Sequence, residues 1–178
     1  MPAIERVGHV GIHVNDLDAS ADFYRDLLGF QITDEDRGRG MVFMSQHPEE
    51  EHHELMLCAG RDAPRGAHVL QQMSFRCSNL SDVLDYWRRL VASGVTIRST
   101  ISHGNAISCY FEDPDGNNCE VYWPTGLQAH QPYGQPLDFN EPAEALLDEV
   151  RRHVAVYGET GFPPRERAGS PAPASSAD

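Results

Sequence analysis

The sequence predicts an α+β fold made of two copies of one βαβββ module, followed by a C-terminal helix. Three observations predict it: the chain repeats itself, each copy starts with an alternating segment followed by a helical stripe, and an amphipathic helix lies beyond the repeat. The segment from His9 aligns with the segment from Gln72 at a shift of 63, so that Asp22-Phe23-Tyr24-Arg25 meets Asp85-Tyr86-Trp87-Arg88. Such a repeat indicates a duplicated structural unit.

The elements of the first copy follow from its apolar pattern. Residues 7–14 alternate between apolar and small or polar side chains, which is typical of a half-buried strand. Residues 15–29 have helical apolar spacing, with Asp16 or Asp18 as the N-cap and Gly29 as the end. Turn residues then separate three more strand-like segments. Because the apolar faces pack under the helices, the polar faces of the two copies are expected to meet across a cleft.

Side chains that bind metals occur at matching positions of the two copies. His9 and Gln72 lie on the two first strands, and a second match at a shift of 66 makes Glu54 equivalent to Glu120 on the two last strands. A carboxylate that is buried without a charged partner, as expected of Glu120, needs a metal cation or strong hydrogen-bond donors. Imidazole and oxygen ligands together favour Fe(II), Mn(II), Ni(II) or Co(II). His13 is excluded from an ion bound by His9, because four strand residues span about 13 Å.

The repeat and two of its segments resemble a known superfamily. The segments are "GHVGIHVNDLDASADFYRDLLGF" and "YFEDPDGNNCEVYW", and with the βαβββ repeat they are similar to the vicinal oxygen chelate superfamily. This superfamily includes glyoxalase I, methylmalonyl-CoA epimerase, fosfomycin-resistance enzymes and type I extradiol dioxygenases. The resemblance covers residues 4–126 and implies two modules, about 4–60 and about 67–126.

The segment that ends at Glu120 looks most like the extradiol dioxygenases. Their fingerprint is a histidine, five to seven residues, an apolar residue and a tyrosine, a turn with proline and glycine, and then the ligand glutamate. Here His103 and Tyr110 stand at that spacing before Glu120, and only Cys109 departs from the usual apolar residue. The resemblance implies that Glu120 binds the metal and that His103 and Tyr110 hydrogen-bond substrate and oxygen groups.

Other site residues are also implied by this resemblance. His9 would be the first metal histidine, and His53, in "HHELML", would be the acid–base group. The second metal histidine of the dioxygenases is replaced by Gln72, which binds through a weaker amide oxygen. Glu54 is a possible fourth ligand. His53 and Glu54 are adjacent and are expected to point to opposite faces, so either of them is a candidate for the site.

The resemblance implies a metal-dependent dioxygenase, most simply with Fe(II), that cleaves a catechol-like ring with dioxygen. The first alternative is a non-redox lyase, isomerase or epimerase of the glyoxalase I type, in which Glu54 or His53 moves the proton. The second alternative is a metal-free, small-molecule-binding resistance protein.

Composition excludes several other classes. The chain has 178 residues, a formal net charge of −13 and a pI near 5.0, which argues against nucleic acids and anionic membranes as partners. It has neither a membrane-spanning apolar run nor a signal pattern, so we expect a cytoplasmic protein. The four cysteines are scattered and are expected to be reduced and mostly buried.

The C-terminal segment lies outside the repeat. Residues 127–165 are expected to form a strap and a helix, with Asn140 as the N-cap, Pro142 in the first turn and Gly158 at the end. The apolar stripe of this helix, Leu146, Val150, Val154 and Tyr157, must be buried on the domain or on a partner subunit. Residues 166–178 are expected to be disordered. We expect a homodimer that acts on a small molecule.

Overall fold

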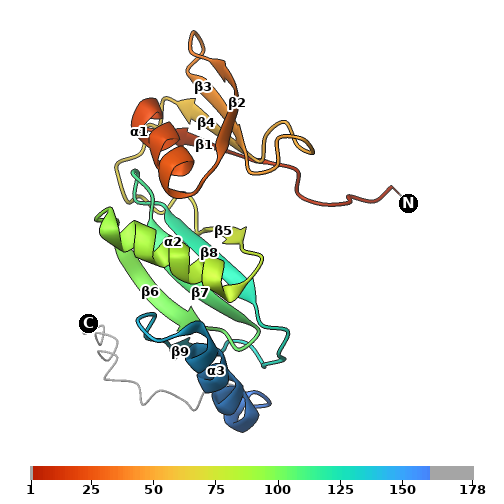
Figure 1. Cartoon of the computed structure of the whole chain (residues 1–178). Coiled ribbons are helices and arrows are strands. Elements are labelled where there is room, and N and C mark those ends of the chain that lie inside the picture. Colours follow the sequence, from red (N-terminus) through yellow and green to blue (C-terminus); the bar gives the residue numbers. More distant parts are fainter. Residues whose placement is uncertain (1, 161–178) are drawn as a thin grey trace, which may run out of the picture.

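The computed structural model describes residues 2–160 and contains two β-sheets, one from each copy of the repeat (Figure 1). The first sheet has the order β1-β4-β3-β2 and the second has the order β5-β8-β7-β6-β9. The first sheet consists of β1 (Val10–Val14), β2 (Gln31–Asp36), β3 (Met41–Ser45) and β4 (Leu55–Ala59). The second consists of β5 (Met73–Arg76), β6 (Ile97–Ser102), β7 (Ala106–Glu112), β8 (Asn118–Pro124) and β9 (Gln135–Pro136).

The helices follow the first strand of each copy, as predicted. Helix α1 (Leu17–Asp22) continues into a short π-helix, η1 (Phe23–Leu27), and α2 spans Leu80–Ala92. The carboxylate of Asp16 accepts the backbone N–H of Ala19, which confirms one of the two predicted caps. Together with α3 (Ala143–Tyr157), these elements confirm the α+β class, the paired βαβββ modules and the added C-terminal helix.

The C-terminal segment packs on the second module. Leu146 and Val150 of α3 are completely buried, so the predicted apolar stripe is confirmed. The predicted cap is wrong: Pro142 occupies the N-cap position, and the side chain of Asn140 bonds to Asp138 instead. The strap, residues 127–142, adds β9 to the second sheet by pairing with β6, a strand the repeat did not predict. The predicted tail at residues 166–178, and residues 161–165, lie outside the described residues.

A polar turn at residues 113–117 joins the two modules. Asp113 accepts the hydroxyl of the completely buried Tyr24 at 2.9 Å, across 89 residues of sequence. Asp115 accepts the side-chain amide of Asn15 at 2.5 Å. Both aspartates are buried, and two N–H groups of the turn also donate to Asp113. The turn therefore fixes the two modules to each other as well as connecting β7 to β8.

The strand registers correct one predicted equivalence. Leu55 lies opposite the first residue of β1, and Cys119 lies opposite the first residue of β5. Leu55 and Cys119 are therefore equivalent, and the residue equivalent to Glu120 is Met56. The predicted equivalence of Glu54 with Glu120 is wrong, because Glu54 precedes β4 whereas Glu120 lies within β8.

Candidate functional site

Glu120 lies on the face of the second sheet opposite to α2. Its strand neighbours Cys119 and Val121 are buried in the core, and successive strand residues point to opposite faces. Ser74 is its partner on β5 and donates its hydroxyl to the Glu120 carboxylate. The side-chain amide of Gln72 also donates to this carboxylate, at 3.1 Å. Glu120, a residue that is only 6% exposed, thus obtains donors from the neighbouring strand segment.

Tyr110 and His103 extend this cluster on the same sheet. Tyr110 lies directly opposite Glu120 in the antiparallel pairing of β7 with β8. Its hydroxyl is 3.1 Å from Nε2 of His103, and Nδ1 of His103 is 2.9 Å from the carbonyl oxygen of Tyr133. Burial raises the pKa of Tyr110, and hydrogen bonding and charge from Glu120 raise it further, so the phenol stays protonated at neutral pH.

His9 and His53 lie together on the first module. Their ring centroids are 4.3 Å apart, and Phe43 packs edge-on against His53 at 5.1 Å. Burial lowers the pKa of His53, and the neighbouring imidazoles of His9 and His52 lower it further. His53 is therefore neutral at pH 7, in the form that accepts a proton.

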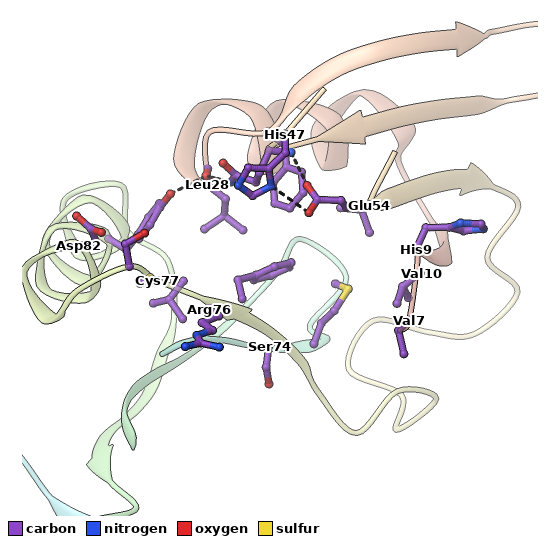
Figure 2. A pocket seen from close by; sticks show the side chains of 18 of the residues that line it. Val7, His9, Val10, Leu28, His47, Glu54, Ser74, Arg76, Cys77 and Asp82 are labelled. Atoms are coloured by element: carbon purple, nitrogen blue, oxygen red, sulfur yellow. Dashed lines mark hydrogen bonds and ion pairs between the residues drawn. The ribbon is translucent and has the colours of Figure 1, made fainter. Parts of the chain in front are cut away.

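The side chain of Glu54 makes its hydrogen bonds with residues 45–47. Its carboxylate accepts the backbone N–H of Gln46 at 2.7 Å and the hydroxyl of Ser45 at 3.2 Å, and it pairs with the ring of His47. Burial alone would raise the pKa of Glu54, but these contacts outweigh it and the pKa is lowered. Glu54, His47 and His9 line a cavity of about 750 Å³ between the modules. In Figure 2 the side chains of Glu54 and His47 lie against each other, whereas the ring of His9 points away from them.

The predicted site residues therefore form two groups. The imidazole half-site is His9 with His53, and the carboxylate half-site is the set of Gln72, Glu120, Tyr110 and His103. Within residues 2–160, no hydrogen bond joins the two half-sites, and no three His, Cys, Asp or Glu side chains gather closely enough to hold an ion. The donor chemistry still fits a divalent metal, since a buried carboxylate and an amide lie on one module and an imidazole pair lies on the other.

Two contributors to the carboxylate half-site were not predicted. Ser74 shares the polar face of its strand with Gln72, so strand alternation would have identified it. Tyr133 acts through its backbone carbonyl, which every residue has. No residue-type signal in the sequence indicates a role of that kind.

The chain belongs to the glyoxalase/bleomycin resistance protein/dioxygenase superfamily, whose profile matches residues 6–121. It is 31% identical over 125 residues to a biphenyl-2,3-diol 1,2-dioxygenase of Rhodococcus globerulus, a match that covers 68% of this chain and 64% of that protein. It is also 40% identical over 58 residues to a catechol-2,3-dioxygenase of Bacillus subtilis, covering 33% of this chain and 20% of that protein. The chain thus spans less than two thirds of the length of these curated relatives.

Solved structures support the fold. A lactoylglutathione lyase from Agrobacterium tumefaciens superposes with a TM-score of 0.54 at 24% identity, over 68% of this chain and 96% of that chain. An integron cassette protein from a sewage-outfall metagenome gives a TM-score of 0.57 at 24% identity, over 67% of this chain and 99% of that chain. None of the helices within residues 2–160 combines the length and apolarity that crossing a bilayer requires.

Proposed function

We propose that the protein is a metal-dependent extradiol-type dioxygenase that cleaves a catechol-like aromatic ring with dioxygen. The observation that carries this proposal is the His103–Tyr110 hydrogen bond beside Glu120 and Gln72 on one sheet face. Relatives that are named as dioxygenases of a biphenyl-diol and of catechol support this proposal.

In this proposal, His9, Gln72 and Glu120 hold the metal. Glu120 supplies the charge that a divalent cation needs in a buried place, and Gln72 supplies a neutral oxygen. When bound, a divalent metal such as Fe(II) provides adjacent positions for two vicinal oxygens and the redox chemistry with dioxygen. Mn(II), Ni(II) and Co(II) suit the same mixture of ligands.

The remaining residues act on protons and charge. His53, whose pKa is lowered, takes a proton from a substrate hydroxyl. The hydrogen-bonded pair of Tyr110 and His103 would stabilise oxygen atoms that become negative during ring cleavage, Tyr110 through its hydroxyl and His103 by orienting that hydroxyl, since a preorganised donor stabilises a transition state without reorganisation.

We further propose that the active form is a homodimer in which the imidazole half-site of one subunit meets the carboxylate half-site of its partner. Strands β1 and β5 are edge strands, each paired on only one side within residues 2–160. Unpaired strand edges are templates for pairing with another chain. His9 directly precedes β1 and Gln72 directly precedes β5, so these two ligand positions would meet where the start of β1 lies beside the start of the partner's β5.

One observation favours a second candidate, a non-redox lyase, isomerase or epimerase. Gln72 occupies the place of an expected histidine ligand, and an amide oxygen weakens a site for iron. In that case the bound metal would polarise the substrate oxygens, and His53 would move the proton between carbon atoms.

Metal analysis of protein purified without chelators, followed by oxygen uptake with a panel of catechols, tests the proposal. We expect bound iron and oxygen consumption that depends on the catechol. Bound metal without oxygen uptake on any catechol would contradict the dioxygenase and favour the non-redox enzyme. Protein that takes up neither metal nor oxygen would favour a binding protein.

A further inference from the structure

The strap makes hydrogen bonds with His103, although the strap lies outside the part of the chain that matches the superfamily. Nδ1 of His103 is 2.9 Å from the carbonyl oxygen of Tyr133. A carbonyl oxygen only accepts hydrogen bonds, so Nδ1 must carry the hydrogen. In a neutral imidazole the other nitrogen is then an acceptor, and the Tyr110 hydroxyl, 3.1 Å from Nε2, must donate to it.

One side chain holds both ends of the His103–Tyr133 contact. The side-chain amide nitrogen of Gln131 donates to the His103 carbonyl at 2.8 Å and to the carbonyl of Ala129 at 3.3 Å. Its amide oxygen accepts the backbone N–H of Tyr133 at 3.1 Å. Because both donor and acceptor are used, only an amide side chain of this length satisfies both backbones.

The surroundings fix the rest of the strap. The buried side chain of Tyr133 bonds through its hydroxyl to His153 on α3. Two residues further along, Gln135 begins β9 and pairs with Ser102, the residue directly before His103. The strap is therefore held by α3 on one side and by β6 on the other, and Gln131 connects the backbone of Tyr133 to the backbone of His103.

We propose that Gln131 is a positioning residue that locks His103 in its Nδ1–H tautomer, with Nε2 directed at Tyr110 as a hydrogen-bond acceptor. An imidazole without fixed partners exchanges between both tautomers. The lock gives the Tyr110 hydroxyl, which lies across the strands from Glu120, a fixed acceptor in Nε2 of His103. The strap thus determines the hydrogen-bonding state of His103 in the carboxylate half-site.

Nitrogen NMR of the neutral histidine rings in full-length, metal-free protein tests this directly, with the His103 signals assigned by their loss in His103→Asn. We expect the wild type to show a protonated Nδ1 and an unprotonated Nε2. Gln131→Ala should convert this pattern to a tautomer mixture. The matched control is Gln128→Ala, an exposed glutamine on the same strap, which should keep the wild-type pattern.

A second variant tests whether the strap or Tyr110 fixes the tautomer of His103. Tyr110→Phe removes the hydroxyl donor but leaves the Tyr133 carbonyl in place, so Nδ1 should stay protonated. Three results would each overturn the assignment: a protonated Nε2 in the wild type, an unchanged pattern in Gln131→Ala, or loss of the pattern in Tyr110→Phe. If Gln131→Ala does not fold, the first and third results can still be measured.

A kinetic arm rests on the proposed dioxygenase. If the protein is this dioxygenase, Gln131→Ala should lower kcat by roughly tenfold at unchanged KM, because His103 keeps its position but not its single tautomer. The NMR pattern needs no turnover, so failure of the proposed function would leave the tautomer result standing.

Discussion

At the scale of single residues, the structure shows which groups surround the carboxylate of Glu120 inside strand β8. Its donors are Ser74 and Gln72 on the parallel strand beside it, and Tyr110 lies opposite on the other side. Two neutral donors satisfy the hydrogen-bonding capacity of a buried carboxylate in part, but they do not neutralise its charge. A cation is therefore the expected additional partner.

Glu120→Gln should abolish metal binding with little change in stability, because the amide keeps the size and one acceptor of the carboxylate but loses its charge. Elemental analysis and a melting curve of each purified variant measure the two effects. Glu54→Gln is the matched control, since Glu54 is also partly buried and hydrogen-bonded, and it should retain the metal. The reverse result, with metal lost only in the Glu54 variant, would move the ligand assignment to Glu54.

Gln72→His should raise the affinity for Fe(II) by about tenfold, or ~1.4 kcal/mol, because imidazole is a better ligand than a neutral amide oxygen. In a dioxygenase, oxygen uptake with a catechol should persist or increase. Titration of metal-free protein with Fe(II) measures the affinity. Altered metal preference without any oxygen uptake would indicate the non-redox enzyme instead.

At the scale of elements, the turn at residues 113–117 does more than connect two strands. Its aspartates hold Tyr24 of η1 and Asn15 at the end of the first strand segment, so one short turn orients the first module on the second. The strap has a comparable role at the other end of β6, where it places a carbonyl on His103. In both cases a loop determines the position of side chains that lie far away in sequence.

Tyr24→Phe should lower the free energy of unfolding by about 1–2 kcal/mol at neutral pH, because Asp113 loses a buried donor. Burial, together with Cys119 and Asp113, raises the pKa of Tyr24 well above its usual 10.0. The unfolded tyrosine ionises near pH 10 and the folded one does not, so the stability that Tyr24 contributes declines as the pH rises above 10.

Urea unfolding at neutral pH and at about pH 10.5 checks this, since the unfolded phenol is then mostly ionised. The variant should be less stable than wild type at neutral pH, and the difference should narrow at the alkaline pH. A difference that is the same at both values would contradict the assigned role of the hydroxyl.

At the scale of the whole molecule, each of the two sheets has an edge strand, β1 or β5, next to its part of the candidate site. Helices α1 and α2 cover the opposite faces, and α3 and the strap are added to the second module (Figure 1). Neither half-site contains a sufficient ligand set for a metal by itself. We therefore propose that the site is completed by assembly of two chains into a twofold dimer.

Mixing two inactive variants tests the shared site. His9→Ala and Glu120→Gln should each lack metal, but a mixed dimer joins the intact His9 of one subunit to the intact Glu120 of the other. Random mixing after unfolding and refolding should restore about one quarter of the wild-type metal content, since half of the twofold dimers are mixed and one of their two sites is intact. No recovery in a sample proven to be dimeric by light scattering would show that each site lies within one chain.

The sequence by itself determined the two modules, their helices and the apolar stripe of α3, because periodic burial leaves a pattern in the residues of each element. The resemblance of this segment to the dioxygenase fingerprint also placed His103, Tyr110 and Glu120 together on one module. Only the tertiary structure decided that His53 lies beside His9 while Glu54 faces the cavity, because Glu54 precedes β4 and strand alternation does not extend to it. It also decided the Gln131 contacts with the backbone at His103, since backbone groups are identical in every residue and only folding brings particular ones together.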